Sequence, residues 1–181
     1  MAIIVLIGAS GSGKSTVGHE LEKKGIPQLV SFTTREKRLG EKHGIDYYFT
    51  SKKLIENISP NMISEISEYN SNYYGLFKSE IMEKLQEYEN TYFISNADGA
   101  RQLVNMFPNE VTCFWLSVSV ETMIERMERR GDSDIDILSR VKHAIKTEEL
   151  FEPKGLDIIT IDANRSTDDI LKEIMLEVNK K

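Results

Sequence analysis

The sequence contains a single cysteine, Cys113, among its 181 residues. One thiol excludes an intrachain disulfide framework and a cysteine-rich zinc site by count alone. Cys113 lies within the apolar run Val111–Leu116, so we expect it to be a buried core thiol. Because structural disulfides are characteristic of oxidising compartments, this composition favours a cytoplasmic protein.

Long apolar runs are also missing. No stretch approaches the ~20 consecutive apolar residues that a membrane-spanning helix needs, so we expect no membrane partner. Met1 and Ala2 lead directly into a predicted strand, so we expect no signal peptide. The length and the ordinary apolar content predict one compact domain, residues 1–181, with a sizeable core.

The sequence also lacks an excess of positive charge, since its formal net charge is −6. A nucleic acid partner needs a basic face on the protein, so the overall charge argues against one. The arginines are nevertheless clustered: one group contains Arg35 and Arg38, and a second lies within residues 126–140. Local arginine clusters on an acidic protein favour small phosphorylated ligands.

The strongest positive signal is the segment Gly8–Ser15, which has the form G-x-x-x-x-G-K-S. Residues 3–7 before it predict a buried strand, and residues 15–24 after it predict a helix. In this setting the glycines let backbone N–H groups and the helix N-terminus converge on phosphate. Lys14 can then reach the β- and γ-phosphates of a nucleotide, and the Ser15 hydroxyl can bind Mg²⁺. The predicted nucleotide-binding residues are Gly8, Ala9, Ser10, Gly11, Ser12, Gly13, Lys14, Ser15 and Thr16.

Strand-like apolar runs alternate with helical segments along the chain, which predicts an α/β fold with a largely parallel sheet. Looser apolar spacing after Pro60 predicts a small separate sheet, with strands at 62–66 and 72–75. The other expected strands are 3–7, 28–32, 47–49, 92–94, 111–116 and 158–161. The expected helices are 15–24, 51–58, 79–88, 99–106, 120–130, 135–150 and a last one that begins at Ser166 or Thr167.

Three further patterns are candidates for binding phosphorylated ligands. In residues 31–41, Arg35 and Arg38 follow hydroxyl residues, and guanidinium groups bind phosphate oxygens in pairs; the alternative is a solvated charged loop. Glu65 could accept the two parallel N–H groups of a guanine edge, or it could be an exposed strand residue. The arginines of residues 126–140 flank a flexible turn, which suits a lid over a phosphoryl group or a solvated helix face.

Taken together, these residues resemble the guanylate kinase family over nearly the whole chain. The family's S…T-T-R-x-x-R-x-G-E run is matched within residues 31–41, followed by Asp46-Tyr47. Its N-Y-Y-G is matched by Asn72–Gly75. A set of spaced motifs of this kind is more specific than the phosphate loop, residues Gly8–Ser15, alone.

The resemblance implies transfer of a phosphoryl group from ATP, with Mg²⁺, to GMP and to dGMP. It implies a three-layer α/β/α core (residues 1–32, 77–125 and 151–181), a β-rich acceptor-binding insertion (33–76) and a helical lid (126–150). By the same resemblance Glu65 reads the guanine base, and Lys14, Arg35, Arg130 and Arg140 are catalytic. The residues that it implies for the GMP phosphate are Ser31, Arg35, Arg38, Tyr47 and Tyr74.

The chain departs from the family pattern at three places. Leu76 stands where the family has Ser or Thr, so a hydroxyl donor to the guanine is missing. Residues 95–99, Ser-Asn-Ala-Asp-Gly, replace the family's D-x-D-x-Q-G, and Asp98 is the candidate to take over from the missing acids. Asp162 replaces the asparagine that the family has beside the adenine.

Two other functions stay open at this point. Leu76 and the altered residues 95–99 favour a kinase of another phosphate monoester, such as a ribose bisphosphate, whereas Glu65 and the intact T-T-R-x-x-R oppose it. A non-catalytic binding module, like the guanylate-kinase-like domains of scaffold proteins, is disfavoured because Lys14 and Ser15 are present. The sequence fits a monomer or a homodimer.

Overall fold

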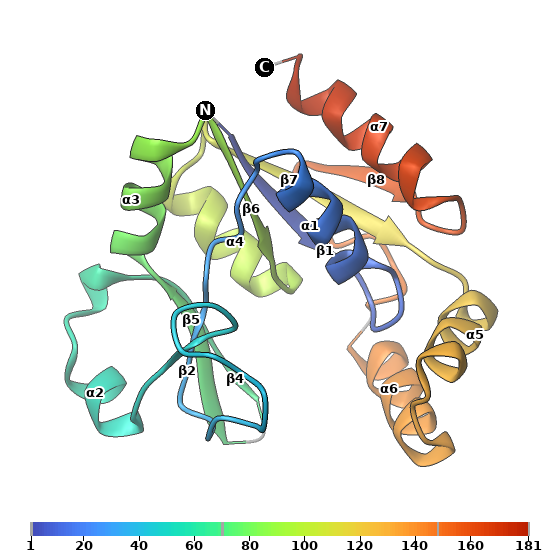
Figure 1. Ribbon diagram of the computed structural model, residues 1–181, viewed down its shortest axis with the longest axis horizontal. Coiled ribbons are helices and arrows are strands. Elements are labelled where there is room, and N and C mark those ends of the chain that lie inside the picture. Colours follow the sequence, from blue (N-terminus) through green and yellow to red (C-terminus); the bar gives the residue numbers. More distant parts are fainter. Residues whose placement is uncertain (1, 70, 148, 181) are drawn as a thin grey trace.

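The computed structural model describes residues 2–69, 71–147 and 149–180. Its centre is a four-stranded sheet in the order β6-β1-β7-β8, in which every neighbouring pair is parallel (Figure 1). Every residue of β1 is buried, because helices cover both faces of a parallel sheet of this type. The four strands are β1 (Ala2–Ile7), β6 (Asn90–Ile94), β7 (Val111–Ser117) and β8 (Ile158–Asp162).

The two faces of this sheet are covered by different helices. Successive side chains of a strand point to opposite faces, so Ile4 and Leu6 pack with α1 (Lys14–Lys23) and α7 (Thr167–Val178). Their neighbours in β1, Ile3 and Val5, pack with α3 (Lys78–Glu87) and α4 (Ala97–Met106) on the other side. The expected three-layer α/β/α architecture is therefore confirmed, and Cys113 is buried within it, as predicted.

A second, mixed sheet in the order β3-β2-β5-β4 lies beside α3 and α4 (Figure 1). It confirms the small separate sheet that was predicted from residues 60–76. Strand β2 is antiparallel to β5, and β5 is antiparallel to β4, while β2 and β3 are parallel. Its elements are β2 (Phe32–Thr33), β3 (Tyr48–Phe49), α2 (Lys52–Asn57), a 3₁₀ helix (Pro60–Met62), β4 (Ile63–Tyr69) and β5 (Asn72–Phe77).

Of the strand expected at residues 28–32, only Phe32 lies in a regular strand of the described structure. Gln28 forms only an isolated bridge with Tyr92, and the regular strand β2 does not begin until Phe32. Pro27 has no N–H group, so its only backbone contribution to this pairing is its carbonyl, which accepts from the Tyr92 N–H at 3.0 Å. The chain then leaves the central sheet and enters the second one.

A helical hairpin of α5 (Val120–Arg130) and α6 (Asp134–Lys146) lies at the opposite side of the central sheet from β4 (Figure 1). Gly131, with φ of 86°, ends α5, and the Ser133 side chain accepts from Asp136 N–H to begin α6. The break predicted at this point is confirmed, but α6 ends at Lys146 rather than near Leu150, and residue 148 lies outside the described residues. Ser166, not Thr167, caps α7.

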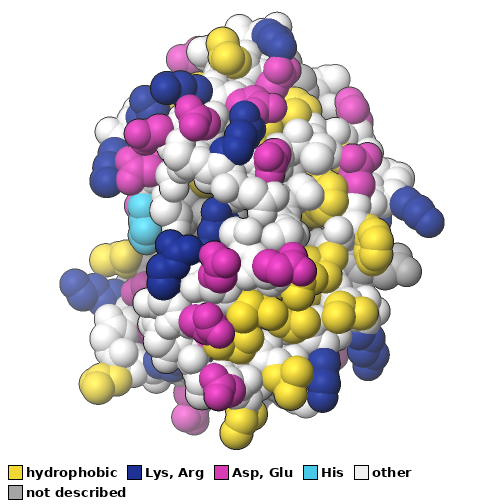
Figure 2. All heavy atoms as spheres, turned by 90° about the vertical axis from the view of Figure 1, so that its right-hand side faces the viewer, with side chains coloured by type: hydrophobic (Ala, Val, Ile, Leu, Met, Phe, Trp, Pro, Cys, Tyr) yellow, Lys and Arg dark blue, Asp and Glu magenta, His cyan; other side chains and the backbone are white. Residues whose placement is uncertain are grey.

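None of the helices within the described ranges is long and apolar enough to cross a membrane. On the face that carries α5, α6 and α7, acidic and basic side chains are interspersed (Figure 2).

Candidate active site

The loop between β1 and α1 is shaped by glycines that cannot be replaced without strain. Gly11 and Gly13 have φ of 78° and 97°, which other residues rarely adopt. A Cβ on Gly11 would lie 2.9 Å from the carbonyl oxygen of Met123, so α5 approaches the loop closely. Gly13 caps α1 without any side-chain hydrogen bond, so the first N–H groups of the helix are available to an anion.

Lys14 is folded back onto this loop. Its ammonium Nζ donates to the carbonyl oxygens of Gly8 at 2.5 Å and Ala9 at 2.9 Å. Burial lowers the pKa of Lys14 to about 8, and the nearby charge of Glu149 opposes that shift. A phosphate group entering the loop would offer this buried ammonium a charged partner in place of two carbonyls.

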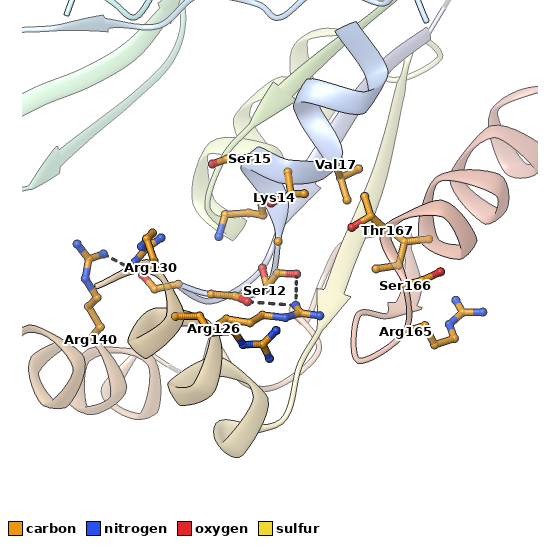
Figure 3. A pocket seen from close by; sticks show the side chains of 16 residues that line it. Ser12, Lys14, Ser15, Val17, Arg126, Arg130, Arg140, Arg165, Ser166 and Thr167 are labelled. Atoms are coloured by element: carbon orange, nitrogen blue, oxygen red, sulfur yellow. Dashed lines mark hydrogen bonds between the residues drawn. The ribbon is translucent and has the colours of Figure 1, made fainter. Parts of the chain in front are cut away.

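A cavity of about 640 Å³ opens over the loop, and its walls come from four separate parts of the chain (Figure 3). It brings the predicted lid residues Arg130 and Arg140 together with the phosphate loop, as well as the start of α7. The lining residues are Ser10, Gly11, Ser12, Gly13, Lys14, Ser15, Thr16, Val17, Arg126, Arg129, Arg130, Arg140, Arg165, Ser166, Thr167 and Ile170.

Asp132, which the sequence did not single out, holds both lid arginines. Arg130 donates to its carboxylate through Nε at 2.9 Å and Nη2 at 2.5 Å, and Nε of Arg140 lies 3.7 Å from the same group. The hydrogen bond from Arg130 lowers the pKa of Asp132, which keeps the carboxylate charged. Arg140 also donates to Ser10 Oγ at 3.2 Å, so the hairpin already touches the phosphate loop.

Arg126 was expected only as a member of the lid cluster, but it has a different position. Its guanidinium donates to the carbonyl oxygens of Gly11 at 3.2 Å and Ser12 at 3.3 Å, and to Ala163 at 2.7 Å. Figure 3 shows the bonds to the phosphate loop, and the bond to Ala163 joins the loop to the turn between β8 and α7. Burial lowers the pKa of Arg126.

The arginine cluster of Arg35 and Arg38 lies in the loop that follows β2 of the small sheet. Arg35 donates to both carboxylate oxygens of Glu41, at 3.0 and 2.7 Å, and this contact lowers the pKa of Glu41 to about 2. The guanidinium carbon of Arg35 is 5.6 Å from the centre of the Tyr47 ring, and the Tyr47 and Tyr74 rings are 6.0 Å apart. Three of the predicted phosphate-binding residues, Arg35, Tyr47 and Tyr74, are therefore together.

The other two predicted phosphate-binding residues, Arg38 and Ser31, make backbone contacts beside this cluster. The Arg38 side chain is exposed in the loop of residues 37–42, where its backbone N–H donates to Glu41 at 2.7 Å. Ser31 lies just before β2, and its carbonyl oxygen accepts from Tyr48 N–H at 2.8 Å.

Glu65 is buried, with 5% of its surface exposed, so the alternative of an exposed strand residue is wrong. It lies opposite Leu76 in the β4–β5 register, which places the carboxylate beside a fully buried apolar side chain. Desolvation raises the pKa of Glu65 to about 7. Asp98, by contrast, has 83% of its side chain exposed and pairs with Arg101 at 2.6 Å.

Comparison with known proteins decides the family. The guanylate kinase family model matches residues 1–179. The chain belongs to the guanylate kinase family. It is 32% identical to the guanylate kinase of Fusobacterium nucleatum, over 96% of this chain and 95% of that one, and 34% identical to that of Prochlorococcus marinus, over 98% and 95%.

The fold is that of a guanylate kinase as well. A crystal structure of guanylate kinase from Anaplasma phagocytophilum superimposes with a TM-score of 0.69 at 24% identity, covering 99% of this chain and 85% of that one. A crystal structure of a gluconokinase from Sinorhizobium meliloti gives a TM-score of 0.52 at 18% identity, over 99% of this chain and 92% of that one, which is a likeness of fold alone. The family assignment and the fold predicted from the sequence are both confirmed.

The structure shows what Asp162, one of the three departures from the family pattern, contacts. Asp162, which replaces an asparagine, accepts from the backbone N–H of Asn164 at 3.0 Å and from its Nδ2 at 2.8 Å. Both bonds lower the pKa of Asp162. Its carboxylate thus stabilises the turn that leads to α7.

Proposed function

We propose that this chain is a guanylate kinase that transfers the γ-phosphoryl group of ATP to GMP, and also to dGMP, giving ADP and the nucleoside diphosphate. The observation that carries the proposal is a pair of anion sites of different construction. One is the backbone-lined loop with Lys14, and the other is the Arg35–Tyr47–Tyr74 cluster on the same small sheet as the buried Glu65.

The donor site is the cavity over the phosphate loop. ATP phosphates meet the N–H groups of residues 8–13 and the N-terminus of α1, while Lys14 turns from the loop carbonyls to the β- and γ-phosphates. Ser15, in the first turn of α1, lines the cavity, and its hydroxyl would hold Mg²⁺. When bound, Mg²⁺ would neutralise charge on the transferring group.

The acceptor site is the cluster on the small sheet. Arg35 and Tyr74 hold the phosphate of GMP together with Ser31, Arg38 and Tyr47, and Arg35 exchanges Glu41 for a phosphate as its partner. The ionised Glu65 carboxylate accepts from N1–H and N2–H of guanine. Asp98 reaches the substrate only if it leaves Arg101.

In this reaction the protein aligns the two substrates and forms no covalent bond with either of them. An oxygen of the GMP phosphate attacks the γ-phosphorus in line, a new P–O bond forms, and the bond to the β–γ bridging oxygen breaks to release ADP. A phosphate monoester is already ionised at neutral pH, so no general base is required. Arg130 and Arg140 stabilise the charge that spreads over the transferring group.

We further propose that residues 33–76 and 126–150 are the parts that close over the two substrates, against a core made of residues 1–32, 77–125 and 151–181. Closure excludes water, which would otherwise accept the phosphoryl group.

A coupled assay of ADP release tests the substrate. With ATP and Mg²⁺ present, we expect turnover with GMP and dGMP, and little with AMP, CMP, UMP or ribose phosphates. Turnover of a ribose phosphate together with silence toward GMP would select the alternative kinase that Leu76 favours. Lys14→Ala is the matched inactive control, because it removes the ammonium of the donor site.

A further inference from the structure

Helix α4 packs against the small sheet through two residues of one helical face, Gly99 and Gln102. They are three positions apart, so they lie one above the other on the helix surface. Both contact strand β4, and they do so at two consecutive residues, Glu65 and Ile66.

Gln102 binds the backbone of Ile66 with both ends of its carboxamide. Its Oε1 accepts from Ile66 N–H at 3.1 Å, and its Nε2 donates to the Ile66 carbonyl oxygen at 3.1 Å. Strand β4 is at the edge of its sheet, where every second residue turns N–H and C=O away from the neighbouring strand. The Gln102 side chain therefore supplies the donor and acceptor that another strand would have supplied.

Gly99 leaves the space that the Glu65 carboxylate occupies. A Cβ added at Gly99 would lie 2.6 Å from Oε1 of Glu65 and 2.8 Å from its Cγ. The carboxylate thus rests directly on the first turn of α4. Gly99 therefore contacts the side chain of Glu65, and Gln102 holds the backbone of the next residue, Ile66.

We propose that Gln102 is a positioning residue for recognition of the nucleobase: by holding Ile66 it sets the place of the adjacent Glu65 carboxylate. The inference rests on the proposed function, in which Glu65 accepts two parallel N–H groups from guanine. Two such bonds are satisfied together only within a few tenths of an ångström, so a shift of β4 along α4 would lose one or both.

Two nucleotides that differ in one group distinguish a positioning role of Gln102 from a merely structural one. Inosine monophosphate (IMP) has the N1–H of GMP but lacks its 2-amino group, so only GMP can use both oxygens of Glu65. Loosening β4 should therefore weaken GMP binding more than IMP binding. A merely structural role for Gln102 would lower stability and leave the ratio of the two affinities unchanged.

The experiment is calorimetric titration of GMP and IMP into the full chain and into Gln102→Leu and Gln102→Ala. We expect the preference for GMP over IMP to fall about tenfold in both variants, while ATP affinity changes less than about twofold. Gln28→Ala is the matched control, because Gln28 also uses its carboxamide in a tertiary hydrogen bond, with Tyr92 Oη at 3.0 Å, but contacts the central sheet.

An unchanged GMP preference in both Gln102 variants would overturn the inference, and so would an equal fall in Gln28→Ala. An unaltered chain that binds GMP no better than IMP would instead refute guanine recognition by Glu65, and with it the proposed function. The two failures are thus distinguishable within one set of titrations.

Discussion

Arg35 is the residue on which the proposed acceptor site depends most. Its side chain is mostly buried, at 15% exposure, and its present partner is a carboxylate that a phosphate can replace. Because charge-assisted hydrogen bonds are stronger than neutral ones, Arg35→Ala should raise the KM for GMP about 10- to 100-fold and leave the KM for ATP nearly unchanged. Steady-state kinetics with each substrate varied in turn measures the split.

The control for Arg35 is Lys37→Ala, which removes an exposed positive charge from the same loop. If both variants raise the KM for GMP equally, long-range attraction by the loop explains the effect, and Arg35 does not hold the phosphate.

If Glu65 recognises the base as proposed, it links that recognition to pH and to stability. The folded protein keeps this carboxyl protonated up to about pH 7, whereas an ordinary glutamate ionises near 4.5. The folded state then binds more protons than the unfolded state between these values, so stability falls as the pH rises from 4.5 through 7. The loss is at most on the order of 3 kcal/mol.

Urea unfolding of the ligand-free chain at pH 5.5 and pH 8 measures this linkage. We expect Glu65→Gln to be more stable than the unaltered chain at pH 8, to lack this part of the pH dependence, and to bind GMP poorly. Equal pH dependence in both proteins would show that Glu65 is not the group that titrates.

The phosphate loop is the element whose shape the glycines determine. Gly11→Ala places a Cβ against the Met123 carbonyl oxygen at a φ of 78°, so the loop or α5 must move. We expect ATP affinity to fall at least about tenfold and stability to fall by about 1–3 kcal/mol, as measured by titration and urea unfolding.

Gly25→Ala is a matched control for the loop. Its φ of 81° imposes similar backbone strain, but a Cβ there would meet no atom within 4 Å. It should lose some stability and keep its ATP affinity. A similar loss of ATP affinity in both variants would contradict the role given to the loop shape.

The hairpin of α5 and α6 is the second element with a testable role. Asp132 binds both Arg130 and Arg140, so in the proposed closure over the substrates less ordering of these side chains would remain. Asp132→Asn should lower kcat about tenfold with little change in the KM for GMP, because the amide has no negative charge and only one accepting oxygen in place of the two that Arg130 uses. Asp134→Asn, exposed in the first turn of α6, is the control, and an unchanged or higher kcat in Asp132→Asn would contradict this role.

For the molecule as a whole, the sequence predicted what depends on local pattern. The strand–loop–helix around Lys14, the break at Gly131 and the separate sheet all follow from residue order and spacing. It did not predict the contacts of Arg126 or Gln102, because their partners are distant in the sequence: Arg126 meets Ala163, and Gln102 meets Ile66. The role of Asp132 was also missed, although Arg130 is only two residues away. Nor did it predict that Asp98 would pair with Arg101 and point into solvent. The predicted helix began at residue 99, whereas α4 begins at Ala97 and includes Asp98.

In the proposed function the molecule has a donor site over the phosphate loop and an acceptor site beside the small sheet. The phosphoryl group must then cross directly from one site to the other, and no single substitution tests this step. ATP labelled at its γ-phosphorus, incubated with GMP, Mg²⁺ and the full chain, tests this requirement. We predict that the label appears in the β-phosphate of GDP, and that this product is lost in Lys14→Ala and strongly reduced in Arg35→Ala. Label released only as inorganic phosphate, or no GDP formed at any GMP concentration, would contradict the account.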